Sequence, residues 1–113
     1  MIEMNNCYKG VGQARTTLTF NFDEEAVNRA GLTKDELLED MRCYAKECDV
    51  EEIAYGVFEK RGEDSMAILI GYAVRKGKYD PDFLNYLTSW MADVNGDIED
   101  CKEEIEKIRN RRS

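Results

Sequence analysis

The last third of the chain places apolar residues at alternating steps of three and four, which is the spacing of a heptad repeat. This spacing keeps one apolar edge of a helix facing a single partner along its whole length. It predicts a long helix over residues 81–111, with Asp80 as the cap and Pro81 as the first helical residue. The apolar edge of that helix comprises Leu84, Leu87, Met91, Val94, Ile98, Cys101, Ile105 and Ile108.

The apolar edge of the predicted helix needs a cover. It can pack on the chain's own sheet and first helix, or a second copy of the chain can pair with it. In a blend of the two, residues 83–94 would be buried in the monomer and residues 98–108 would extend to a second copy. In a parallel pair, Asp97 at a g position would meet Lys102 at an e position. Glu104 would meet Arg109 in the same way, and both pairings are attractive. We therefore predict a homo-oligomer, most simply a dimer, joined through Leu87, Met91, Val94, Ile98, Cys101, Ile105 and Ile108.

Asn95 and Gly96 are the weak point of the predicted helix. Glycine in a helix interior costs about 1 kcal/mol relative to alanine, and Asn-Gly is a turn signal. Asp97 could cap a new helix after a break at this point. Because the heptad phase passes through both residues unbroken, the continuous helix is the prediction.

The first half of the chain gives a strand and then a helix. Residues 16–22 alternate polar and apolar side chains, which predicts a half-buried strand, and a short helical turn that Gly31 ends follows it. Thr33 and Glu36 have the spacing of a capping box, so a helix is predicted over residues 34–48.

Two β-rich runs, residues 53–60 and 65–74, flank a short polar loop and predict a β-hairpin. The whole chain, residues 1–113, is predicted to be a single α+β domain with an irregular segment over residues 1–15. We expect a small antiparallel sheet with helices on one face, in the order strand, helix, hairpin and long C-terminal helix.

The charge balance limits the classes of partner. The net charge is −8 and the pI is near 4.6, so repulsion opposes direct binding to nucleic acid or anionic lipid. A basic protein surface is the better match. The sequence contains no apolar run that would span a membrane and begins without a secretory signal pattern, so we expect a cytoplasmic protein.

The sequence lacks the residue patterns of common catalytic and metal sites. It has no histidine, which removes Ser-His and Cys-His pairs and mixed zinc sites, and its four cysteines form no CxxC motif. We expect free thiols, no metal, no cofactor and no enzymatic activity.

Exposed carboxylates are the main candidate for function. A run near the C-terminus and a second run over residues 35–52 can imitate a phosphate backbone and occupy a basic groove. We predict an acidic protein-binding module, in its sharpest form an inhibitor of a basic, nucleic-acid-handling partner. This format is similar to that of phage-encoded inhibitors of bacterial defence such as anti-CRISPR proteins, although no motif ties the chain to a family. The predicted partner-binding residues are Asp93, Asp97, Glu99, Asp100, Glu103, Glu104 and Glu106.

Two alternatives remain open. Basic clusters beside tyrosines or in a Gly-rich loop can hold an anion, so the chain could bind an anionic nucleotide. It could also be a structural or assembly subunit. The candidate anion contacts are Lys9, Arg15, Arg75, Lys76, Arg109 and Arg111.

Overall fold

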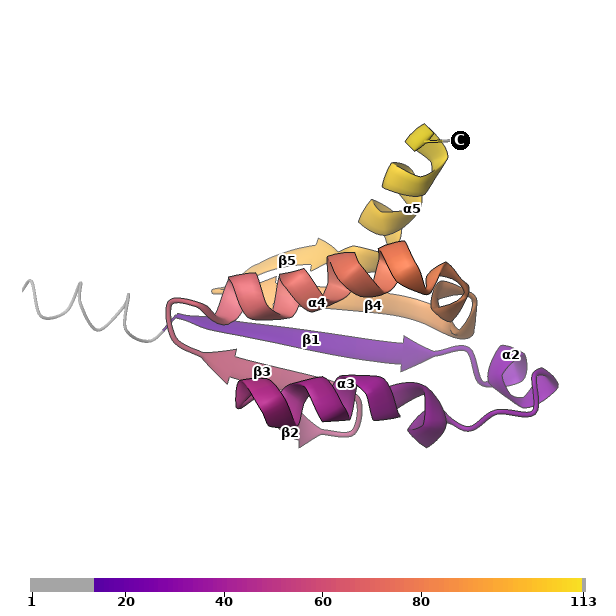
Figure 1. The fold of residues 1–113 in the computed structure, drawn as a ribbon, viewed down its shortest axis with the longest axis horizontal. Helices are drawn as coiled ribbons and strands as arrows, with labels where there is room; N and C mark the ends of the chain where they lie inside the picture. Colours follow the sequence, from indigo (N-terminus) through magenta and orange to yellow (C-terminus); the bar gives the residue numbers. More distant parts are fainter. Residues whose placement is uncertain (1–13, 113) are drawn as a thin grey trace, which may run out of the picture.

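The computed structural model describes the backbone of residues 14–112 and the side chains of residues 14–107. It contains one five-stranded sheet with the strand order β2-β3-β1-β4-β5, and every neighbouring pair is antiparallel (Figure 1). The predicted α+β class with a small antiparallel sheet is confirmed. The elements are β1 (Arg15–Phe22), α2 (Glu24–Arg29), α3 (Lys34–Cys48), β2 (Glu51–Ala54), β3 (Val57–Arg61), α4 (Ser65–Tyr79), the 3₁₀ helix η1 (Pro81–Tyr86), β4 (Leu87–Val94), β5 (Asp97–Asp100) and α5 (Cys101–Arg112).

The central strand β1 follows the alternation in its sequence. Thr16, Leu18 and Phe20 are buried, while the residues between them are only partly covered. Leu18 lies opposite Phe58 on β3 and Ala92 on β4, so the apolar residues of three adjacent strands share one face. The core of the protein forms on that face.

Helices α3 and α4 both lie over the core face of the sheet (Figure 1). Leu38 and Met41 from α3, and Leu69 and Tyr72 from α4, pack against the aromatic residues of the strands. The opposite face carries Arg15 and other polar or charged side chains of the same strands. Placing helices on one face only is typical of an antiparallel sheet.

Helix α3 begins and ends through local signals. Thr33 Oγ1 accepts from the backbone N–H of Glu36, and the Glu36 side chain accepts from the backbone N–H of Thr33 at 2.8 Å. This reciprocal pair satisfies two N–H groups that the first turn leaves free. The predicted range of residues 34–48 is therefore confirmed. Asp49 then ends the helix in a left-handed conformation, with φ of 60°.

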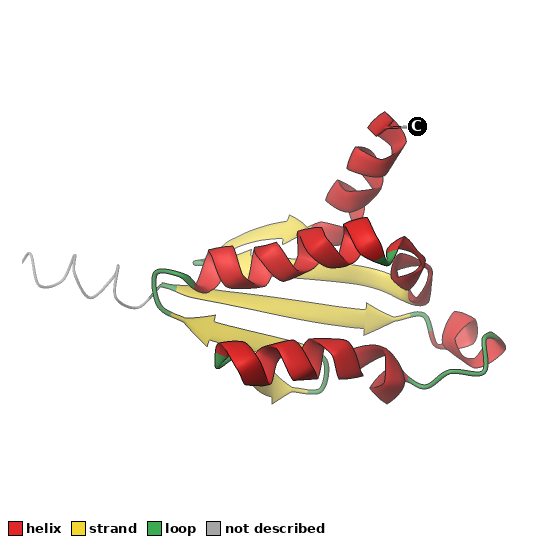
Figure 2. Cartoon of the chain, viewed as in Figure 1, coloured by secondary structure: helices red, strands yellow, loops and turns green. Residues whose placement is uncertain are grey.

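The predicted hairpin of residues 53–60 and 65–74 is wrong. The hairpin joins β2 to β3 through Tyr55 and Gly56, and residues 65–79 form helix α4 (Figure 2). The side chains that α4 buries include Ser65, Leu69, Tyr72 and Ala73, whose spacing is helical. A short apolar run is compatible with both periods, and here the residues that meet the sheet select the helix.

The predicted long helix over residues 81–111 is also wrong. This segment folds into η1, the hairpin β4–β5 and the 12-residue helix α5 (Figure 2). Asn95 and Gly96 have φ of 54° and 99°, and Val94 pairs with Asp97. Positive φ at both central residues is the mark of a type I′ turn, whose twist matches that of the flanking strands.

The predicted oligomer seam is therefore dispersed over different elements. Leu87, Cys101 and Ile105 are buried in the protein's own core. Met91 and Val94 are half-buried on β4, Ile98 on β5 is 59% exposed, and the side chain of Ile108 lies outside the described residues. These residues form no continuous stripe, so the heptad basis for a parallel dimer is removed.

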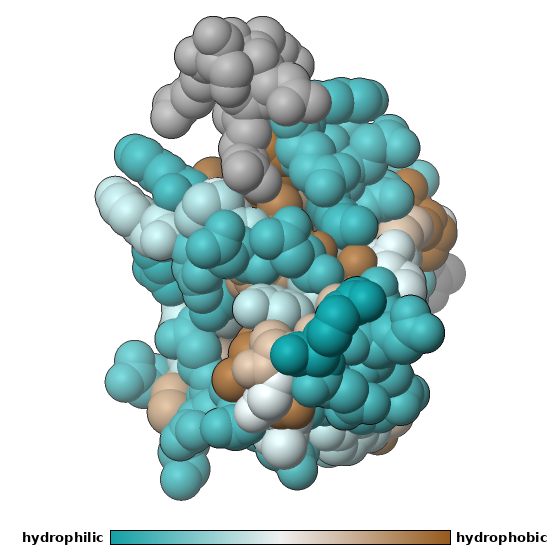
Figure 3. All heavy atoms as spheres, turned by 90° about the vertical axis from the view of Figure 1, so that its right-hand side faces the viewer, coloured by the Kyte–Doolittle hydropathy of each residue, from teal (hydrophilic) through white to brown (hydrophobic). Residues whose placement is uncertain are grey.

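The end of the molecule at which α2 and η1 lie is mostly hydrophilic, with small separate hydrophobic patches (Figure 3). Among the residues that the structure describes, no helix has both the length and the apolar character needed to cross a membrane.

Candidate functional site

The strand β5 is an edge strand of the sheet, and the helix α5 follows it and projects away from the sheet (Figure 1). Both elements carry exposed carboxylates. We call the exposed carboxylates of these two elements the acidic edge. Among the described residues, its only ion pairs join Lys107 to Glu103 at 3.5 Å and to Glu104 at 3.4 Å. Both carboxylates in these pairs are more than half exposed, so water screens the attraction. The acidic edge consists of Asp97, Glu99, Glu103, Glu104 and Glu106.

The other two acidic residues of the predicted partner-binding set have local structural roles. Asp93 accepts a hydrogen bond from the backbone N–H of Gly96 at 2.7 Å and lies 3.4 Å from Arg15 Nη2. Asp100 Oδ1 accepts from the backbone N–H of Glu103 at 3.0 Å, at the start of α5. Asp93 thus supports the β4–β5 turn, and Asp100 caps a helix.

In the second acidic run, residues 35–52, some carboxylates are paired within the protein, whereas Glu39, Glu47 and Glu51 are exposed. Arg42 binds Glu52 through two hydrogen bonds of 2.8 and 3.1 Å and also contacts Asp35 at 3.1 Å. The hydrogen bonds from Arg42 lower the pKa of Glu52 below its ordinary value, although partial burial opposes this shift. The contact between Arg42 and Glu52 joins α3 to β2, so the paired carboxylates Asp35 and Glu52 are less available to a partner than the acidic edge.

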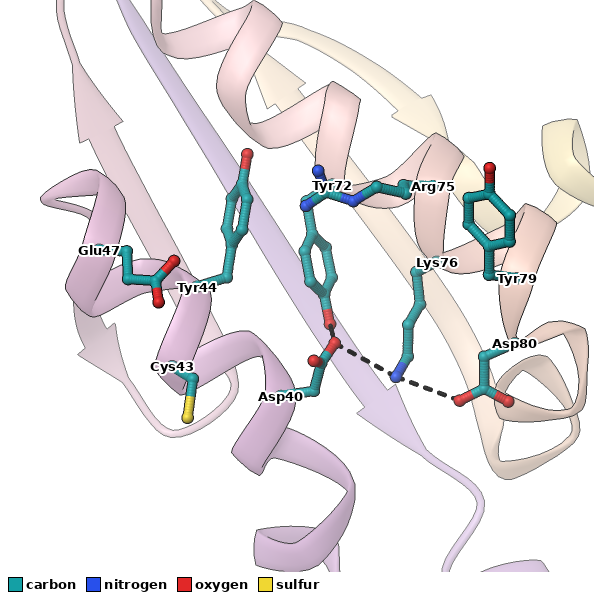
Figure 4. Close-up of a pocket in the computed structure, with 9 residues that line it drawn as sticks. All are labelled: Asp40, Cys43, Tyr44, Glu47, Tyr72, Arg75, Lys76, Tyr79 and Asp80. Carbon is teal, nitrogen blue, oxygen red and sulfur yellow. Dashed lines mark hydrogen bonds and ion pairs between the residues drawn. The ribbon is translucent and has the colours of Figure 1, made fainter.

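A groove of about 430 Å³ lies between α3 and α4 (Figure 4). The groove could not be predicted from the sequence as long as residues 65–74 were expected to form a strand, because a strand there places no second helix beside α3. The signal that could have found it is helical spacing, since a helix places the inner residues of α4 three and four positions apart. The groove is lined by Asp40, Cys43, Tyr44, Glu47, Tyr72, Arg75, Lys76, Tyr79 and Asp80.

A chain of polar contacts crosses the groove from α3 to the end of α4 (Figure 4). The Tyr72 hydroxyl donates to Asp40 Oδ2 at 2.8 Å, and Lys76 Nζ lies 3.3 Å from the same oxygen. Lys76 Nζ also lies 3.2 Å from Asp80 and 4.7 Å from the centre of the Phe83 ring. Two carboxylates therefore neutralise Lys76, which makes it a poor contact for an added anion.

Arg75 has different surroundings in the same groove. Its guanidinium lies 5.1 Å from the centre of the Tyr44 ring, and the Tyr44 hydroxyl donates to the backbone carbonyl of Ile68 at 2.7 Å. Arg75 forms no ion pair with any residue that the structure describes. It is thus the one predicted anion contact, among those with a described side chain, that lacks a carboxylate partner.

The predicted anion contacts do not form one cluster. Arg15 lies on the sheet face opposite the helices, where it pairs with Asp93 at 3.4 Å and contacts Glu59 at 4.0 Å. Only Arg75 and Lys76 share the groove, together with three acidic residues. Lys9 and the side chains of Arg109 and Arg111 lie outside the described residues.

Over the described part of the chain, no group of three or more histidine, cysteine or acidic side chains has the arrangement of a metal site. The thiols differ in exposure: Cys43 is exposed, Cys48 is half-buried and Cys101 is buried. Burial, aided by nearby carboxylates, raises the pKa of Cys101 to about 12.

No family model matches the sequence, and neither a curated protein nor a solved structure is significantly similar to it. The residues themselves are therefore the basis for a functional proposal.

Proposed function

We propose that this protein is a non-enzymatic protein-binding module whose acidic edge engages a basic surface on another protein. The observation that carries the proposal is the exposure of the carboxylates on β5 and α5, which have little pairing among the described residues. A hydrogen-bonded strand and a helix hold their backbones in place. Carboxylates on such elements present a fixed pattern of negative charge.

The net charge of −8 strengthens this proposal. A strongly acidic protein attracts a basic partner over the distance of a Debye length, which raises the association rate and makes it sensitive to salt. The same charge repels nucleic acid. In its sharpest form, the acidic edge would occupy the basic groove of a nucleic-acid-handling protein in the cytoplasm and act as its inhibitor.

The proposal is tested by neutralising the acidic edge and comparing it with a matched control. The edge variant combines Asp97→Asn with Glu99→Gln, Glu103→Gln, Glu104→Gln and Glu106→Gln. The control variant combines Asp82→Asn with Glu25→Gln, Glu39→Gln, Glu47→Gln and Glu51→Gln, all at exposed positions. Because the two variants change the same residue types in equal numbers, they have the same net charge.

Each protein is immobilised, and binding is measured to an arginine-rich peptide and to basic proteins retained from cell extract, over a range of salt concentrations. We expect the edge variant to lose the specific, salt-sensitive binding that the wild type and the control variant keep. Equal binding by both variants would show that net charge alone drives association, and the acidic edge would then not be the binding site.

A second candidate function rests on Arg75. An exposed guanidinium beside a tyrosine ring, inside a groove, can hold a small anionic ligand such as a nucleotide. Asp40, Glu47 and Asp80 in the same groove oppose an anion, which makes this the weaker candidate. A thermal-shift screen against nucleotides tests it, because a stabilisation that Arg75→Met abolishes would favour ligand binding over the acidic edge.

A further inference from the structure

The outer surface of α4 leaves apolar residues uncovered. Met66 is 52% exposed and Val74 is 55% exposed, although the helix buries its other side in the core. Side chains of α4 alone line a shallow depression here, and α3 contributes nothing to it. This surface adjoins the groove, with which it shares Arg75 and Tyr79, and it contains no residue of the acidic edge.

The exposed residues of α4 form a row along one face of the helix. Ala67, Gly71, Val74 and Lys78 follow one another at steps of three and four, with Ile70 beside Gly71. Glu63 comes just before the helix, which begins at Ser65. The row thus has small and branched apolar residues along it and a basic residue at its C-terminal end, and the acidic Glu63 lies in the turn before its N-terminal end.

We infer that two copies of this chain form a dimer through antiparallel packing of their α4 helices. The two-fold axis then passes between Ile70 and Gly71. A residue of one copy lies opposite the residue of the second copy for which the two residue numbers add up to 141. Glu63 then lies opposite Lys78 of the second copy, Ala67 opposite Val74, and Ile70 opposite Gly71.

The row is complementary to itself in charge and in shape. The acidic start of each helix meets the basic end of the other, and the antiparallel arrangement also aligns the helix dipoles favourably. A branched side chain meets a small residue at each apolar level, which lets the helices approach closely. At Gly71, an added Cβ would have no atom of the described residues within 4 Å, so the described part of the fold leaves this position open.

Charge complementarity selects a second copy as the occupant. Neither Glu63 nor Lys78 forms an ion pair with the residues that the structure describes, and Lys78 Nζ lies 5.3 Å from the Tyr79 ring centre. In the dimer, both charges acquire a partner by symmetry, as an isologous interface requires. The inferred dimer contact uses no residue of the acidic edge. A test of the dimer is therefore independent of a test of the proposed function.

The first test is the mass in solution, measured by light scattering over a wide concentration range. We expect a dimer for the wild type and a monomer for Val74→Lys, which places a charge at an exposed apolar position. Glu63→Lys should weaken dimerisation roughly tenfold, because two attractive contacts become repulsive. The double variant with Glu63→Lys and Lys78→Glu should restore the dimer, which a loss of folding would not allow.

The second test is oxidative crosslinking in a background where Cys7, Cys43 and Cys48 are replaced by serine. Gly71→Cys lies beside the axis and should form a disulfide with its symmetry mate. Lys78→Cys should not, since antiparallel helices separate the two copies of this residue by about 22 Å along the axis at 1.5 Å per residue.

A monomer at every concentration would overturn the inference, and slow thiol labelling of Gly71→Cys would then assign the surface to another segment of the same chain. Efficient crosslinking of Lys78→Cys would also overturn it, because that result requires parallel helices.

Discussion

Ile105 on α5 packs directly against the backbone of Gly77 on α4. A methyl group added at Gly77 would lie 2.5 Å from Ile105 Cγ2 and 2.8 Å from its Cδ1. Both residues are buried, and Ile105 is 7% exposed. The missing side chain at position 77 therefore creates the space into which α5 docks.

This contact predicts that Gly77→Ala destabilises the protein, although alanine is the better helix former. The change gains about 1 kcal/mol of helix propensity but forces Ile105 out of its site, at a cost of about 1–3 kcal/mol for overpacking. We expect a net loss of about 1 kcal/mol in the free energy of unfolding, measured by denaturant titration. In the double variant with Ile105→Ala, Gly77→Ala should become neutral or stabilising, and an unchanged effect would contradict the close packing.

Docking of α5 also predicts a difference in reactivity between two thiols. Cys101 is 7% exposed and has a pKa raised to about 12, whereas Cys43 is exposed. Because the thiolate is the reactive form, Cys101 should resist alkylation in the native protein near neutral pH. We expect mass spectrometry in a Cys7→Ser background to show rapid labelling of Cys43 and labelling of Cys101 only after unfolding. In Gly77→Ala, Cys101 should react faster; equal rates for both thiols in the wild type would show that α5 does not stay docked.

Local signals in the sequence predicted β1 and α3 correctly. The alternation of residues 16–22 and the capping box of Thr33 and Glu36 act over a few residues, so they do not depend on the rest of the fold. The two wrong elements share another cause. In residues 65–74 and 87–94, the apolar periodicity alone does not decide between a helix and a strand, and the surfaces that these side chains cover in the fold make the choice.

At Asn95 and Gly96, the turn signal of the Asn-Gly pair outweighs the heptad spacing of the surrounding apolar residues. The positive φ values of Asn95 and Gly96 belong to a two-residue hairpin turn, and the alternation in the second half of β4 buries Trp90 and Ala92. The heptad spacing was coincidental, since Leu87 and Ile105 reach the same core from a strand and a helix. The acidic edge could be predicted as a run of carboxylates, but the structural roles of Asp93 and Asp100 required the turn geometry.

The contact between Arg42 and Glu52 predicts a dependence of stability on acid. The pKa of Glu52 is lowered in the folded state, mainly by its hydrogen bonds from Arg42, so its contribution is present above the ordinary value of 4.5. That contribution is lost as the pH falls through the lowered pKa. Glu52→Gln should therefore cost about 1 kcal/mol near neutral pH, and the cost should disappear in acid.

The natural control is Glu51→Gln, which removes an exposed carboxylate next to Glu52 on β2. Denaturant titrations of the three proteins at several pH values make the comparison. A penalty for Glu52→Gln that persists unchanged below the lowered pKa would mean that its charge does not matter.

Tyr72 predicts the opposite behaviour in alkali. Burial raises its pKa above the ordinary value of 10.0, and the hydrogen bond to Asp40 adds to this shift. The folded state therefore keeps the phenol proton that the unfolded state loses above pH 10.0, so stability falls as the pH rises toward the folded pKa. Tyr72→Phe should cost about 1 kcal/mol near neutral pH through the lost hydrogen bond, and it should reduce the loss of stability in alkali.

Thermal unfolding followed from neutral to alkaline pH measures both effects of Tyr72→Phe. The control is Tyr79→Phe, at a position that is 73% exposed. An alkaline slope that Tyr72→Phe leaves as steep as in the wild type would show that Tyr72 does not hold its proton in the folded protein.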